Sequence, residues 1–136
     1  METERYTILE LVADLERISA EAKNEREILH HVRPLARRAA LSKETWLEER
    51  MYEADAEQGF GVYLLHEEPD HTLAIFAVSW LPDRGTPPHD HGTWGVIAGV
   101  DGPEQNEFFE RVDDRSRSGY AELKKIGAKV FEVGDV

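Results

Sequence analysis

The first part of the chain has the hydrophobic pattern of helices. Between residues 8 and 18, apolar side chains recur at three- and four-residue steps, which places them on one face of a helix. These side chains are Ile8, Leu11, Val12, Leu15 and Ile18. Asn24, three residues before Glu27, has the form of a helix start, because its side chain can accept from a first-turn amide. The pattern therefore predicts one helix around 8–18 and a second that begins after Asn24.

The second predicted helix contains a proline and is followed by a shorter helix. Its apolar face continues over 28–39, and Pro34 interrupts it, so this proline either kinks the helix or begins a new one. Ser42 has the residue type of a helix cap and predicts a third short helix that runs through Met51. We therefore expect residues 1–52 to form a helical part.

After Gly59 the pattern changes to short segments rich in β-branched and aromatic residues. Turn residues separate them, notably Glu68-Pro69-Asp70 and Asp101-Gly102-Pro103. The expected strands are 60–67, 72–80, 93–100, 104–112, 120–126 and 129–133. Helices followed by a run of strands are typical of the α+β class, with an antiparallel sheet or barrel that carries the chemistry. We expect a single domain over 1–136, whose β part spans 58–136.

Composition and charge narrow the choice of partners and compartment. A chain of 136 residues suffices for one domain, and no stretch approaches the ~18 apolar residues of a membrane helix. The formal net charge of −12 repels phosphate backbones and anionic lipids, so we expect neither nucleic acid nor membrane as a partner. The chain has no cysteine, which excludes thiolate ligands and disulfides and fits a cytoplasmic protein.

The segment 85–92, with the sequence GTPPHDHG, is the most informative for chemistry. Two histidines at a spacing of two on a strand point to the same face, so the imidazoles of His89 and His91 are expected to converge. Neutral imidazole suits iron, zinc, copper and nickel. The pair therefore predicts two ligands of a divalent metal, and the alternative is a pair of surface or loop histidines. His66 and His71 flank a predicted hairpin and are expected at the surface.

The arrangement of Trp80, then His89-Asp90-His91-Gly92, then Trp94-Gly95-Val96-Ile97 resembles the first motif of the cupin superfamily. Within it, the stretch is similar to the cysteine-dioxygenase-like branch, the thiol dioxygenases, particularly its uncharacterised bacterial members. The likeness covers residues 58–136. It implies a six- or eight-stranded jelly-roll barrel that holds ferrous iron, with zinc, nickel or manganese as alternative metals. It also implies that both atoms of O2 are inserted at the sulfur of a small thiol.

The ligand set that the resemblance implies is incomplete in this chain. Many cupins have a glutamate ligand four or five residues beyond the second histidine, where this chain has Gly95 and Val96. Thiol dioxygenases lack that glutamate too and use three histidines. The third belongs to a second motif, and the last four residues of the chain resemble the opening of that motif. The resemblance therefore implies a third ligand beyond Val136 and a chain truncated at its C-terminus.

The resemblance transfers less well to the substrate pocket. The arginine that grips the carboxylate of cysteine in cysteine-type enzymes falls at Tyr63, and a cysteine that some members crosslink falls at Val96. A phenol cannot form the bidentate ion pair of a guanidinium, which disfavours free cysteine as the substrate. Tyr63, Trp80 and Val96 are the candidate pocket-lining residues, and filling the barrel core is their alternative role.

Three functions are open at this point. The first is a mononuclear non-haem Fe(II) dioxygenase that oxidises a small thiol to a sulfinate with O2. The second is another metal-dependent cupin reaction, such as isomerisation, decarboxylation or oxidation at carbon, because fold and metal do not fix the chemistry. The third is a non-catalytic binding module whose exposed strand edges pair with another subunit to form a homo-oligomer.

Overall fold

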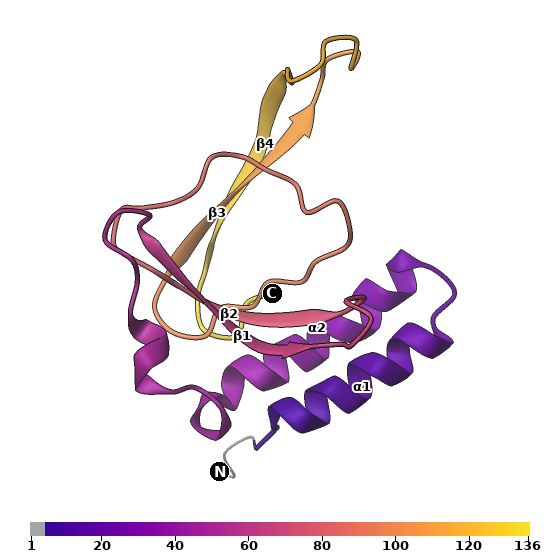
Figure 1. The fold of residues 1–136 in the computed structure, drawn as a ribbon, viewed down its shortest axis with the longest axis vertical. Helices are drawn as coiled ribbons and strands as arrows, with labels where there is room; N and C mark the ends of the chain where they lie inside the picture. Colours follow the sequence, from indigo (N-terminus) through magenta and orange to yellow (C-terminus); the bar gives the residue numbers. More distant parts are fainter. Residues whose placement is uncertain (1–4) are drawn as a thin grey trace.

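A computed structural model describes residues 5–136, so the first four residues of the predicted helical part lie outside the described region. Two helices come first, α1 (Ile8–Glu21) and α2 (Glu25–Leu41), followed by the short 3-10 helices η1 (Lys43–Thr45) and η2 (Glu49–Tyr52). Four strands form two antiparallel hairpins, β1 (Phe60–Glu67) with β2 (Ala74–Trp80), and β3 (Glu104–Arg111) with β4 (Leu123–Phe131). The protein therefore belongs to the α+β class (Figure 1).

The two helices begin at side-chain caps. Asn24 caps α2 as predicted, since its Oδ1 accepts from the Glu27 amide at 2.9 Å. α1 begins at a capping box: the Thr7 hydroxyl accepts from the Glu10 amide at 3.2 Å, and the Glu10 carboxylate accepts from the Thr7 amide at 2.9 Å. The predicted apolar stripe of α1 is confirmed by its buried residues, which are Leu11, Val12, Leu15 and Ile18.

The predictions for the end of the helical part need correction. Of the two alternatives for Pro34, the start of a new helix is excluded, because this proline lies inside α2. Ser42 caps no third α-helix, and the segment after it forms only the two 3-10 turns η1 and η2. The reason is that the Ser42 hydroxyl is engaged elsewhere: the side chain is 0% exposed and its Oγ accepts from the Tyr6 amide at 2.9 Å.

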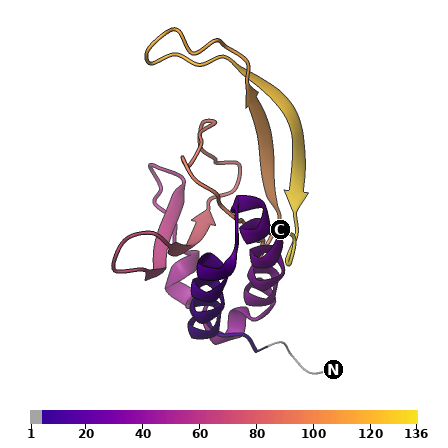
Figure 2. The same ribbon diagram turned by 90° about the vertical axis from the view of Figure 1, so that its right-hand side faces the viewer.

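The main core lies between the two helices, which run side by side as an antiparallel pair (Figure 2). Its buried cluster consists of Tyr6, Leu11, Leu15, Ile18, Val32 and Ala39. The β1–β2 hairpin packs on this cluster through Leu73 and Ile75, and the loop before β3 packs on it through Trp94 and Val96. The strand-rich part thus packs on the pair of helices.

One face of the β1–β2 hairpin packs toward the helices and the other remains open. The open face carries two apolar cross-strand pairs, Val62 with Val78 and Leu64 with Phe76. These four side chains are between 46% and 54% exposed. The register shifts by one residue between Leu64 and His66, which marks a β-bulge at the end of β1.

The β3–β4 hairpin projects away from the helices (Figures 1 and 2). The two strands expected over 120–126 and 129–133 are in fact the single strand β4. At its base, the amide of Gly99 donates to the carbonyl of Asp135, and the amide of Gly134 donates to the carbonyl of Gly99, both at 2.9 Å. A Cβ added to Gly99 would lie 2.4 Å from the carbonyl oxygen of Glu132, so this close approach requires glycine.

The strands within residues 5–136 form two separate sheets and no closed barrel. The strand predicted over 93–100 is not formed, and the whole connection 81–103 is irregular. Trp94 and Val96 instead bury part of their surface against the helical core, which competes with pairing in a sheet. None of the helices in this described part is long and apolar enough to cross a membrane.

Candidate metal centre

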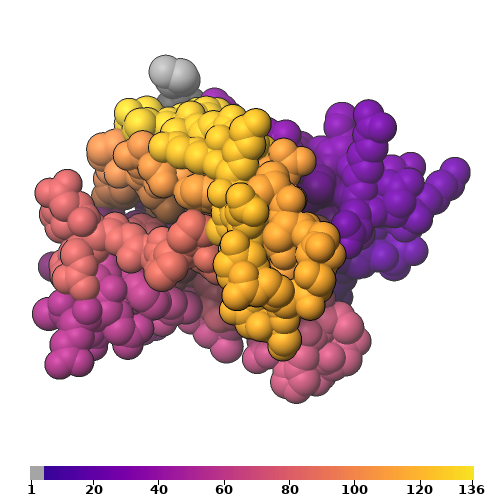
Figure 3. Space-filling model, turned by 90° about the horizontal axis from the view of Figure 1, so that it is seen from above, coloured from indigo at the N-terminus to yellow at the C-terminus, as the bar shows by residue number. Residues whose placement is uncertain are grey.

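The two histidines of the HDHG motif lie in the irregular connection 81–103. This connection crosses the space between the two hairpins (Figure 1) and is at the surface beside the β3–β4 hairpin (Figure 3). His89 and His91 are both exposed, and their ring centroids are 5.1 Å apart with ring planes at 8°. The two rings lie side by side, but the strand that was expected to make them converge is not formed, since neither residue belongs to a strand.

One hydrogen bond determines which nitrogen of His89 is free. Its Nδ1 lies 2.9 Å from the carbonyl oxygen of Pro87. A carbonyl oxygen only accepts, so Nδ1 carries the hydrogen and the neutral ring has its lone pair on Nε2. A metal-bound histidine is typically held in this way, with its second ring nitrogen donating to a backbone carbonyl. His89 therefore fits the role of a metal ligand through Nε2.

His91 completes a pair but not a full coordination sphere. Its ring is nearly parallel to that of His89, so one of the two exposed rings must turn before both nitrogens point at one ion. Within residues 5–136, no aspartate, glutamate or further histidine joins the pair to make a group of three donors. The pair thus supplies two neutral nitrogen ligands, which suit iron, zinc or nickel.

The charge of Asp90, the residue between the two histidines, acts on Arg111. The pKa of Arg111, at the end of β3, is raised chiefly by its hydrogen bond to Asp113, with smaller contributions from the charges of Asp113 and Asp90. The Arg111–Asp113 contact is bidentate, with nitrogen-to-oxygen distances of 2.6 and 3.1 Å. The charge of Asp90 thus contributes, as the smallest of these effects, to the raised pKa of Arg111.

The three candidate pocket-lining residues do not share one surface. Tyr63 donates through its hydroxyl to the carbonyl of Glu53, and the Arg50 guanidinium lies 5.6 Å from its ring centroid. Trp80 pairs across the hairpin with Phe60, on the opposite face of the sheet from Tyr63. Val96 packs on the helical core. The structure thus places Tyr63 and Trp80 on opposite sides of the β1–β2 hairpin.

Trp80 connects the two hairpins. Its ring centroid is 5.5 Å from that of Phe60, and its indole lies close to Glu104 at the start of β3. Burial raises the pKa of Glu104, and the nearby indole N–H of Trp80 opposes that rise. A half-buried carboxylate that retains its proton to a higher pH thus lies next to the open face of β1–β2.

The remaining histidines divide into exposed and half-buried ones. His71 is exposed as expected, with its Nδ1 2.8 Å from the Glu67 carboxylate. His30 and His31 on α2 are exposed, with ring centroids 5.3 Å apart. The expectation of an exposed His66 is wrong, because this side chain is half-buried between the β1–β2 hairpin and α1.

Comparison with family models and with solved structures finds no match. No protein-family model matches the chain, and no solved structure matches it.

Proposed function

We propose that the chain binds a divalent metal, preferably ferrous iron, through His89 and His91. One observation carries the proposal: Nδ1 of His89 is bound by the Pro87 carbonyl, which leaves Nε2 available beside a second imidazole whose centroid is 5.1 Å away. Zinc, nickel and manganese are the competing ions. Selection among them depends on the remaining ligands, because imidazole alone discriminates poorly.

The activity that we infer is the oxidation of a small thiol, R–SH + O2 → R–SO2⁻ + H⁺. The bound iron would supply the site at which thiolate and O2 meet. The two histidines provide neutral ligands and act as no general base. The resemblance in the 80–97 segment supports this activity, while Tyr63 at the position of the carboxylate-binding arginine disfavours cysteine itself. Small thiols without a carboxylate are therefore the expected substrates.

We further infer that the two hairpins belong to a jelly-roll barrel. The support is the open apolar face of β1–β2, formed by Val62, Leu64, Phe76 and Val78. A sheet face of this composition is normally buried against another sheet. Closure would bring 93–100 into a sheet as the sequence predicts, and Trp80 would then lie on the inner wall beside the metal loop.

The test of the metal site measures metal content in the untagged chain after anaerobic reconstitution with ferrous iron. We compare it with the double variant His89→Ala/His91→Ala and with His30→Ala/His31→Ala, a matched control in which a second exposed histidine pair is removed. We expect the site variant to lose about one equivalent of iron and the control to lose none. Equal iron content in all three proteins contradicts the proposal.

The test of the activity measures O2 consumption by the iron-loaded chain with a panel of small thiols. The matched alcohols serve as controls, because they lack the sulfur that would receive oxygen. We expect uptake of one O2 per thiol and a sulfinate product by mass spectrometry. Iron bound without thiol-dependent uptake would reject the oxygenase activity and favour a different metal-dependent reaction or a non-catalytic module.

A further inference from the structure

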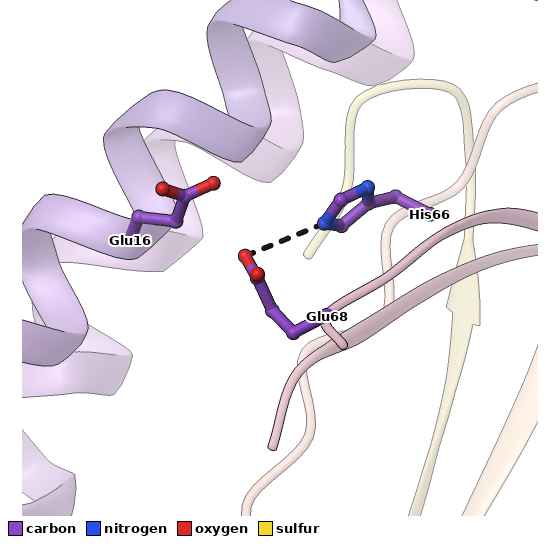
Figure 4. A group of neighbouring side chains, drawn as sticks. All are labelled: Glu16, His66 and Glu68. Carbon is purple, nitrogen blue, oxygen red and sulfur yellow. Dashed lines mark ion pairs between the residues drawn. The ribbon is translucent and has the colours of Figure 1, made fainter. Parts of the chain in front are cut away.

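A second group of metal-binding side chains lies away from the HDHG motif. Glu16 of α1, His66 at the end of β1 and Glu68 in the following turn each offer one ligand atom, and these atoms lie within 4.8 Å of one another. Figure 4 shows the Glu16 carboxylate directed from the helix toward the other two side chains. Within residues 5–136, this is the single group of three such donors.

The β-bulge explains why His66 faces the helix. Val62 and Leu64 are on the open face of β1, and regular alternation would place residue 66 there as well. The extra residue at the bulge shifts the register, so that His66 pairs with Ile75 instead. Ile75 packs on the helical core, and residues paired across two strands share a face. The bulge thus turns His66 from the open face toward α1.

Two atoms of the group are buried without a hydrogen-bond partner. Nε2 of His66 and Oε1 of Glu68 are both shielded from solvent, and neither has a hydrogen bond within the described residues. They lie 3.3 Å apart, which is within ion-pair distance when His66 is protonated (dashed line in Figure 4) but longer than the about 2.7–2.9 Å of a charge-assisted hydrogen bond. Buried polar atoms in proteins nearly always have a hydrogen-bond partner or a ligand, and this contact supplies neither atom with a hydrogen bond.

A bound cation would satisfy both atoms at their present spacing. Two ligands at about 2.0–2.1 Å from a tetrahedral ion lie about 3.4 Å from each other, close to the 3.3 Å that separates Nε2 of His66 from Oε1 of Glu68. Neither Glu16 nor Glu68 forms an ion pair with a lysine or arginine of the described region. The group therefore has two carboxylates whose charge a divalent cation would balance.

We propose that Glu16, His66 and Glu68 form a zinc-type site with a fourth position for water. One imidazole and two carboxylates suit Zn²⁺, while the imidazole disfavours Ca²⁺ and Mg²⁺. The site joins α1 to the β1–β2 hairpin, elements fifty residues apart in sequence (positions 16 and 66). Bound zinc would link the β1–β2 hairpin to α1 and so stabilise their packing.

The test uses the full chain in the His89→Ala/His91→Ala background, so that its result does not depend on the function proposed above. Zinc chloride is titrated into metal-free protein by calorimetry, and the Tm is measured with and without zinc. We expect one equivalent of zinc to bind and to raise the Tm. Absence of zinc binding, or binding without a rise in Tm, overturns the proposal.

Variants in that background assign the ligands. Glu16→Gln removes an exposed carboxylate and should weaken zinc binding at least tenfold, as should His66→Gln. Glu21→Gln, at the exposed end of the same helix, should leave the affinity unchanged. Replacement of zinc by Co²⁺ should give the intense visible absorption of a tetrahedral ion with the parent and not with Glu16→Gln. Equal zinc affinity in Glu16→Gln and Glu21→Gln overturns the assignment of the ligands. This comparison does not depend on whether His66→Gln folds.

Discussion

Ser42→Ala tests how the end of α2 is held to the start of α1. The hydroxyl of Ser42 accepts from the Tyr6 amide at 2.9 Å, and both residues are almost completely buried, at 0% and 2% exposure. Alanine removes the acceptor without opening a route for water. The cost of leaving a buried amide without a partner is about 1–3 kcal/mol. With an unfolding entropy of about 2.1 cal/mol/K per residue, this corresponds to a Tm lower by about 4–10 °C for the 136-residue chain.

The assay is thermal unfolding followed by far-UV circular dichroism, with Ser19→Ala as the matched control. Ser19 lies on the exposed side of α1, where alanine changes stability by at most about 0.7 kcal/mol, in the stabilising direction. We expect the two serine variants to differ by several degrees. Equal Tm values would refute the reasoning, because they would mean that the Tyr6 amide finds another acceptor when the hydroxyl is gone.

Two further predictions concern pH and backbone geometry. The pKa of Asp14 is lowered, chiefly by the hydrogen bond from Tyr6, so this carboxylate stabilises the fold above its unfolded pKa of about 3.9 and loses that effect as the pH falls through the folded value. We therefore expect the free energy of unfolding of Tyr6→Phe, measured by urea titration, to fall less between pH 5 and pH 2 than that of the parent. An equal fall in the two proteins contradicts the expectation. Gly99→Ala should lower the Tm because its Cβ meets a backbone carbonyl, whereas Gly85→Ala, with no atom within 4 Å, should be neutral or slightly stabilising. Similar Tm values for the two glycine variants would disprove the close approach at Gly99.

The sequence predicts the elements whose pattern is local. The apolar stripe locates α1, the Asn24 cap locates the start of α2, and the expected strand 60–67 coincides with β1. The predicted strand 93–100 fails because two of its apolar residues, Trp94 and Val96, pack on helices that lie fifty or more residues earlier. Local periodicity cannot distinguish burial in a sheet from burial against a helix.

The same distinction applies to the candidate sites. His89 and His91 are two residues apart, so their proximity is predictable even though the reason given for it, a strand, is wrong. The group of Glu16, His66 and Glu68 has no sequence signature, since it depends on a one-residue bulge and on the packing of α1 against a distant hairpin. A histidine beside a predicted turn indicates only a surface position, and the structure overturns that expectation for His66.

The two proposed sites should differ in how metal binding couples to folding. A ligand stabilises a protein only to the extent that it prefers the folded over the unfolded chain. His89 and His91 are neighbours in one exposed loop, so the unfolded chain can offer much the same pair, and a metal bound there should raise the Tm little. Glu16 and His66 meet only after α1 and β1 have packed, so zinc bound between them should raise the Tm markedly. Metal binding without a rise in Tm is therefore expected of the loop site formed by His89 and His91. Metal binding with a marked rise in Tm is expected of the site formed by Glu16, His66 and Glu68.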